Sequence, residues 1–301
     1  MDIQTSEQIK NKPFFYKPFF IPPKNNIFAD RAIRFDELAA EEKNSWREYL
    51  ALLAELSRAQ NTALNAVLPE TTQPENAGAT KLPESNGDTI PPLFFKCLQI
   101  ITRKLQGKVN DTVQAALNTL VEQKQADVEG IAKRVLREEV PDSEQVYRIW
   151  VHAALQCAWT AWAGQLTDDD VPSVEERSVC PCCGGEAVAS VVLSGGDWHG
   201  LRYLHCAVCN SRWNALRAKC TFCGDQSAIE FHQIEGADSG VLHGARGESC
   251  GKCGHYRKLL LLENQQYADP IADDLASLAV DILLGSENIQ RGGHNPFLLA
   301  E

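Results

Sequence analysis

The stretch CPCCGGEAVASVVLSGGDWHGLRYLHCAVCNSRWNALRAKCTFCGDQSAIEFHQIEGADSGVLHGARGESCGKCG, residues 180–254, contains four Cys-x-x-Cys pairs. The pairs are Cys180/Cys183, Cys206/Cys209, Cys220/Cys223 and Cys250/Cys253. Two intervening residues let both sulfur atoms of a tight turn point at one ion, and two such turns supply the four thiolates of a closed tetrahedral site. Glycine follows three of the pairs, at Gly184, Gly224 and Gly254, and suits the left-handed backbone of such a turn. The stretch therefore predicts two metal sites.

The spacing of the pairs indicates which of them share a site. The first two pairs are separated by 22 residues and the last two by 26, lengths that fit a hairpin or small sheet. Cys220 follows Cys180 by 40 residues and Cys250 follows Cys206 by 44, so the pattern repeats. We interpret the region as two copies of one zinc-ribbon or rubredoxin-like unit. The spacing also allows an interleaved pairing.

The spacing does not identify the metal, and three cysteines lie outside the four pairs. Closed four-thiolate sites suit zinc or iron, and spacing alone does not separate the two metals. A thioredoxin-type redox motif is a weaker interpretation, because such motifs usually occur once beside a βαβ pattern. Cys182 is an extra cysteine inside the first pair, and we expect it to stay a free thiol. Cys97 and Cys157 lie in apolar helical patterns, which favours burial in a core.

Charge and hydropathy argue against a nucleic-acid-binding protein and against a membrane-spanning one. The 301 residues carry a net charge of −11, and residues 175–258 contain nine Lys/Arg and nine Asp/Glu. A ribbon that binds nucleic acid should present a basic face, so we expect a protein partner and no nucleic acid. No apolar run approaches the length of a membrane span, and residues 1–24 lack the pattern of a signal peptide. We therefore expect a cytoplasmic protein, in which paired cysteines bind metal more often than they form disulfides.

Hydrophobic periodicity predicts an α+β protein in which helices precede the cysteine-rich region. We expect an extended arm over 1–27, an α-helical domain over 28–170, a tandem metal-binding module over 177–265, and a C-terminal helix and tail over 266–301. Within the helical domain the pattern predicts helices over 29–41 and 45–67, a polar loop over 69–92 and further helices from 93 to 164. Aromatic residues at helical spacing from Tyr147 to Trp162 indicate a helix that faces the core. The C-terminal helix should cover 269–284.

Several stretches resemble one known family when they are taken as a set. CPCCG, GLRYLHCAVCNSRW, KCTFCG and SCGKCGHYRK, followed by ADDLASLAVDILL and NPFLL, are similar to the formate dehydrogenase accessory protein family, FdhE. The earlier segments RAIRFDELAA and WREYLALLAELSRAQ extend the resemblance over most of the chain. It is strongest from 180 to 299.

The resemblance implies a cytoplasmic maturation protein, not an enzyme, that active respiratory formate dehydrogenase requires. Such a protein would bind the catalytic (alpha) subunit before its export. The resemblance also implies two rubredoxin-like metal ions, with iron favoured over zinc, and as ligands Cys180, Cys183, Cys206, Cys209, Cys220, Cys223, Cys250 and Cys253.

The sequence leaves one alternative function and one question of assembly open. The alternative is a redox-active iron–thiolate protein that reduces or protects the cofactor site of a client enzyme. The chain contains neither the G-x-x-x-x-G-K-[ST] nor the G-x-G-x-x-G phosphate-binding pattern. No membrane insertion is expected, and a homodimer remains open.

Overall fold

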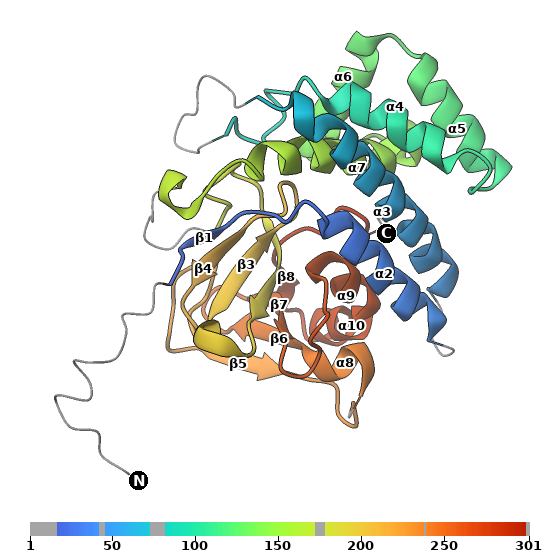
Figure 1. Ribbon diagram of the computed structural model, residues 1–301. Coiled ribbons are helices and arrows are strands. Elements are labelled where there is room, and N and C mark those ends of the chain that lie inside the picture. Colours follow the sequence, from blue (N-terminus) through green and yellow to red (C-terminus); the bar gives the residue numbers. More distant parts are fainter. Residues whose placement is uncertain (1–16, 42–45, 73–81, 172–177, 238, 299–301) are drawn as a thin grey trace.

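The computed structural model describes residues 17–41, 46–72, 82–171, 178–237 and 239–298. Helices from the first half of the chain form a layer on one side of the molecule, and the cysteine-rich half forms a mixed sheet on the other (Figure 1). This arrangement confirms the α+β architecture predicted from the sequence. Among the described residues, no helix has both the length and the apolar character needed to cross a bilayer.

Six helices make up most of the first half of the chain. They are α2 (Ile27–Ala40), α3 (Arg47–Val67), α4 (Phe94–Leu105), α5 (Asp111–Glu122), α6 (Gln125–Leu136) and α7 (Gln145–Ala163). Short turns of 3₁₀ helix cover Leu68–Glu70, Asp142–Glu144, Asp168–Asp170 and Gly196–Trp198. Helix α7 is buried on all sides from Trp150 to Ala163, including Trp159, because α3, α4, α5 and α6 all pack against it. The prediction of a core-facing aromatic helix is confirmed.

Among the described residues, the two cysteine-rich units and two further short strands form one sheet of eight strands. The strands are β1 (Phe20–Ile21), β2 (Ala187–Val192), β3 (Arg202–Cys206), β4 (Arg212–Ala215), β5 (Ile229–His232), β6 (Ala245–Cys250), β7 (His255–Leu261) and β8 (Gln290–Arg291). Each unit is an antiparallel set, β2-β3-β4 and β5-β6-β7. Strands β2 and β7 then pair in parallel, with Ser190 opposite Leu259, so the units share one continuous sheet.

The predicted N-terminal arm ends as an edge strand. Strand β1 pairs antiparallel with β4, and Phe20 lies opposite Trp213 with both side chains buried. The first part of the arm, residues 1–16, lies outside the described residues. The chain then runs through Pro22 and Pro23 into α2, which lies away from the edge strand, toward α9 (Figure 1).

The C-terminal region contains two helices where the sequence predicted one over 269–284. Helix α9 covers Pro270–Ala276 and α10 covers Leu278–Ser286. The break is at Ser277, whose hydroxyl donates to the carbonyl oxygens of Asp273 and Asp274 and so competes with continued helix. Helix α9 contacts β2 and α2, whereas α10 packs on β6. A short helix, α8 (Gly240–Gly244), precedes β6.

Candidate metal centres

The four cysteines of the first two pairs converge at one point, which we call the first cluster: Cys180, Cys183, Cys206 and Cys209. The Sγ atoms of Cys180 and Cys209 lie 3.6 Å apart, and those of Cys183 and Cys206 lie 3.5 Å apart. Thiolates about 2.3 Å from a central ion stand about 3.8 Å apart in a tetrahedron. A disulfide needs sulfurs about 2.05 Å apart. The donor set therefore fits a tetrahedral metal ion and does not fit a disulfide.

The last two pairs form a second cluster of the same shape: Cys220, Cys223, Cys250 and Cys253. The Sγ atoms of Cys220 and Cys253 are 3.6 Å apart, and those of Cys223 and Cys250 are 3.7 Å apart. The spatial grouping is thus first pair with second and third with fourth, not interleaved. That the eight thiolates ligate metal remains a prediction that the geometry permits.

Backbone amides support the sulfur atoms in both clusters. The N–H groups of Val208 and Cys209 each lie 3.4 Å from Cys206 Sγ, and the N–H groups of Phe222 and Cys223 lie 3.4 and 3.5 Å from Cys220 Sγ. Such bonds disperse the negative charge that two thiolates bring to one turn. They become stronger when the sulfur is ionised, so the turns favour thiolate over thiol.

The first cluster is enclosed between the helical layer and the sheet. All four of its cysteines are buried. The N–H of Ser85 donates to the carbonyl oxygen of Cys183 at 2.8 Å, and the side-chain amide of Gln156 in α7 donates to the carbonyl oxygen of Ala207 at 2.6 Å. The loop before α4 and the helix α7 therefore both bind the turns that present the sulfurs.

Asn210 ties the same turn to three further elements. It occupies the position after Cys209 with φ 59°, where the other three pairs have glycine. Its Nδ2 donates to Thr160 Oγ1 at 2.9 Å, and its Oδ1 accepts from Arg31 at 2.8 Å. Arg31 in turn pairs with Asp269 at the start of α9. Asn210 was not predicted as part of the site, although an asparagine that replaces glycine in one of four equivalent turns was a usable signal.

The second cluster reaches the surface. Cys223 is exposed and Cys253 is half-buried, whereas Cys220 and Cys250 are buried. The ring of Phe222 closes one side, with the guanidinium of Arg257 stacked 4.5 Å from the ring centre. On its other side Phe222 contacts Gly292, where a Cβ would lie 1.9 Å from the ring. A partner or a small reactant can reach this cluster but not the first one.

Metal binding to the first cluster should depend on pH, because its thiols must lose protons to bind a cation. Burial raises the pKa of Cys180 and of Cys206 well above the ordinary value of a thiol. Without a cation these sulfurs keep their protons, so metal binding would release protons and depend on pH. His205 is not part of the cluster; burial lowers its pKa to about 3, and its neutral ring lies beside Asn210 and Arg212.

The three remaining cysteines are all buried. Cys182 lies inside the first turn but outside the group of four sulfurs. Its carbonyl oxygen accepts from the N–H of Leu82 at 2.9 Å, so its backbone helps to hold the loop before α4. Cys97 and Cys157 are buried in the helical core, as predicted.

Comparisons with known proteins cover almost the whole chain. Three family models match, described as FdhE, N-terminal, over residues 16–176, FdhE, central domain, over 179–217, and FdhE, C-terminal domain, over 218–298. The boundary between the last two lies between the two clusters, so each model contains one cluster.

Individual relatives agree with the family models. A Protein FdhE homolog from Actinobacillus pleuropneumoniae serotype 3 (strain JL03) is 34% identical over 98% of this chain and 95% of its own. A Protein FdhE homolog from Haemophilus influenzae (strain PittEE) is 32% identical over 93% and 90%. The crystal structure of the FdhE protein from Pseudomonas aeruginosa superposes with a TM-score of 0.79 at 28% identity, covering 93% of this chain and 99% of that one.

Proposed function

Because the chain belongs to the FdhE family, we propose that it is a non-enzymatic accessory protein for the maturation of formate dehydrogenase. It acts in the cytoplasm and binds the catalytic (alpha) subunit of a respiratory formate dehydrogenase before that subunit is exported. The relatives that support this proposal match nearly the full length of the chain, so the helical layer and both clusters lie within the matched region.

The observation that carries the proposal is the unequal placement of two otherwise similar clusters. Four thiolates complete a tetrahedral site and leave no open position for a substrate, which is typical of structural rather than catalytic metal. The first cluster lies between the helical layer and the sheet and would hold them together. The second cluster offers Cys223 at the surface, where another protein can contact it. This division suits a binding protein.

The eight cysteines of the two clusters are the ligands we propose, with iron as the favoured ion in both. Iron held by four thiolates would supply one-electron redox chemistry, which zinc does not supply. The backbone amides at Cys206 and Cys220 stabilise the thiolates for either metal. Metal analysis of anaerobically purified protein identifies the ion.

A deletion strain tests the accessory role. Removal of the gene should abolish formate dehydrogenase activity, and the intact gene on a plasmid should restore it, with the empty plasmid as control. The tagged protein should also capture the catalytic subunit from an extract. Normal formate dehydrogenase activity in the deletion strain would refute the accessory role.

A second function is favoured by the exposure of Cys223 and the partial exposure of Cys253. An iron–thiolate centre at the surface lies within reach of a client, so it could reduce or protect the client's cofactor site. Redox titration of the purified protein, followed by its visible absorption, distinguishes this function from simple binding. If both clusters hold only zinc, electron transfer is ruled out and the binding role is unaffected.

A further inference from the structure

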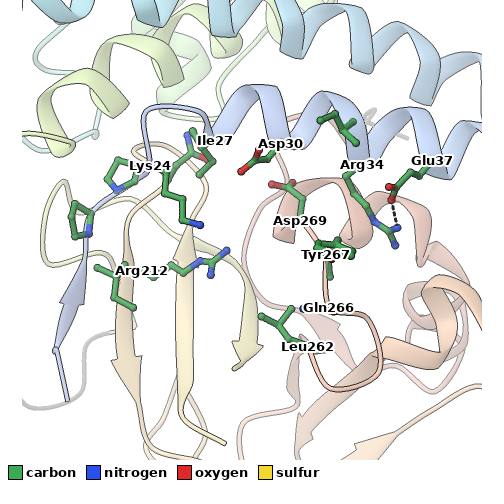
Figure 2. A pocket seen from close by; sticks show the side chains of 16 residues that line it. Lys24, Ile27, Asp30, Arg34, Glu37, Arg212, Leu262, Gln266, Tyr267 and Asp269 are labelled. Atoms are coloured by element: carbon green, nitrogen blue, oxygen red, sulfur yellow. Dashed lines mark hydrogen bonds and ion pairs between the residues drawn. The ribbon is translucent and has the colours of Figure 1, made fainter. Parts of the chain in front are cut away.

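A cavity of about 490 Å³ lies beside the interface between the helical layer and the sheet. Its walls are the exposed face of α2, the turn Pro22–Lys24, strand β4 at Arg212, and the loop 262–269 that leads into α9 (Figure 2). Its volume falls in the range of ordinary ligand sites. None of the eight clustered cysteines lines it.

Two cations at one end of the cavity, Lys24 and Arg212, have no hydrogen-bonded acidic partner among the described residues. The side chain of Lys24 makes no hydrogen bond or ion pair with any of these residues. Arg212 donates to the neutral ring of His205 at 3.3 Å, and the carboxylate of Asp269 attracts it but is already bound by Arg31 at 2.9 Å. Both side chains point toward the same region of the cavity in Figure 2. The next arginine along the wall differs, since Arg34 is held by Asp273 through bonds of 2.6 and 2.9 Å. The end formed by Lys24 and Arg212 is therefore ready to bind an anion.

Acidic side chains in the lining limit how much negative charge can enter. Asp30 and Glu37 on α2 and Asp269 before α9 all line the cavity, and the chain as a whole carries −11. A strongly acidic ligand would be repelled by these carboxylates, whereas a single carboxylate can lie at the cationic end. The cavity therefore favours a ligand with one negative charge, placed at the end formed by Lys24 and Arg212.

The rim of the cavity carries exposed apolar side chains. Tyr267 is 74% exposed and Ile33 is 59% exposed. Tyrosine is enriched at the energetic centres of protein interfaces, because it buries a large area with little loss of conformational freedom. The α2 wall runs from Ile27 to Glu37, a rise of about 15 Å, which matches four or five residues of extended chain.

We propose that this cavity binds an extended segment of the client polypeptide. One Asp or Glu side chain of the segment contacts Lys24 and Arg212, and apolar neighbours pack on Ile33 and Tyr267. The inference rests on the proposed function, because it identifies the surface that holds the catalytic subunit. A polypeptide fits better than a small molecule, since the apolar contacts lie on the open rim and not on an enclosed floor.

Calorimetric titration of the purified catalytic subunit into the full-length protein tests this surface. The variant Lys24→Gln/Tyr267→Ala changes two exposed side chains away from both clusters, so its metal content and melting temperature should match the wild type. We expect its affinity to fall at least tenfold. Arg212→Gln should weaken binding in the same direction, and Lys24→Gln alone should reduce the salt dependence of binding.

The matched control is Lys104→Gln/Trp198→Ala, which removes one exposed lysine and one exposed tryptophan outside the cavity. It should bind as the wild type does. If the cavity variant binds as tightly as the wild type, or the control loses as much affinity, the cavity is not the surface and the accessory role survives. If the wild type itself does not bind the subunit, the proposed function and this inference both fall.

Discussion

Asn210 shows how one residue can join a metal turn to the rest of the molecule. Its positive φ is the conformation that glycine supplies after the other three pairs, and its side chain adds bonds to Thr160 and Arg31 that glycine cannot make. The side chain of asparagine makes the contacts that this turn needs, and asparagine is one of the few residues other than glycine that readily adopt a positive φ. The residue is a link between the first cluster, α7 and α2.

Replacing Asn210 by glycine should separate these two roles. Asn210→Gly keeps the backbone conformation but leaves buried polar groups on Arg31 and Thr160 without partners, so we expect a loss of about 2–4 kcal/mol in the free energy of unfolding. Denaturant unfolding of the metal-loaded protein measures this loss. The control is Gly224→Asn, where a Cβ would meet only Lys219 at 3.6 Å, and it should change stability by less than about 1 kcal/mol. Equal stability of the two variants would contradict the linking role.

The buried ring of His294 should make the folded protein less stable at acidic pH. Burial, with a further contribution from the cation of Arg148, lowers the pKa of His294 to about 4. The ring stays neutral in the fold and lies 3.1 Å from the Arg148 guanidinium. In the unfolded chain it takes up a proton near its ordinary pKa of about 6.5. Its contribution to stability is therefore complete above about pH 6.5 and is lost as the pH falls toward 4.

Between pH 7.0 and 5.5 we expect this one group to lower the free energy of unfolding by about 1 kcal/mol. His294→Gln should lose that much less than the wild type over the same interval, measured by denaturant unfolding at equal metal content. His243→Gln, which alters an exposed histidine, should keep the wild-type dependence. Identical pH profiles for wild type and His294→Gln would exclude this role.

Spacing identified the four pairs and favoured the grouping of first with second and third with fourth, but it also allowed an interleaved pairing, which the structure excludes. It could not identify Ser85, Lys24 or Arg212, since these meet the turns or the cavity through contacts between segments far apart in sequence. The sequence also placed Cys182 outside the sites, and the structure has its sulfur buried but outside the group of four.

At the scale of elements, hydrophobic periodicity predicted the helices, but it could not predict which distant strands pair. The helices predicted over 29–41 and 45–67 agree with α2 and α3 within two residues, because each has a continuous apolar face. The break at Ser277 was missed because a serine inside an apolar helical pattern can stay in the helix or end it. The parallel pairing of β2 with β7 joins residues about 70 positions apart, which no local pattern reveals.

The strand β8 next to the second cluster offers a test of how that cluster is supported. Gly292 follows β8, and a Cβ there would lie 1.9 Å from the Phe222 ring, which must then move. Because Phe222 lies between Cys220 and Cys223 in sequence, Gly292→Ala should loosen the second cluster and leave the first one intact. We expect faster loss of one metal ion to a chelator, followed by metal analysis. The control Gly285→Ala meets no atom within 4 Å and should release metal at the wild-type rate. An unchanged rate in Gly292→Ala would show that Phe222 does not support the cluster.

At the scale of the whole molecule, the two clusters occupy different environments in one continuous sheet. The first lies under α7 and the loop before α4, whereas the second has Cys223 exposed, although both precede neighbouring parallel strands, β2 and β7. The sequence treats the two units as copies, so it could not tell which of them the helical layer would cover. The asymmetry arises because α7 and the loop before α4 bind the turns of the first cluster, whereas no hydrogen bond between described residues joins the helical layer to the turns of the second.

The rate of metal release tests this asymmetry most directly. Anaerobically purified protein should contain two metal ions per chain and release them to a chelator in two phases, one fast and one slow, because only the second cluster is exposed. Cys223→Ser should abolish the fast phase alone, Cys206→Ser should remove the slowly released ion and lower the melting temperature, and Cys182→Ser should change neither. Release of both ions at one rate, or full metal content in Cys223→Ser, would contradict the account.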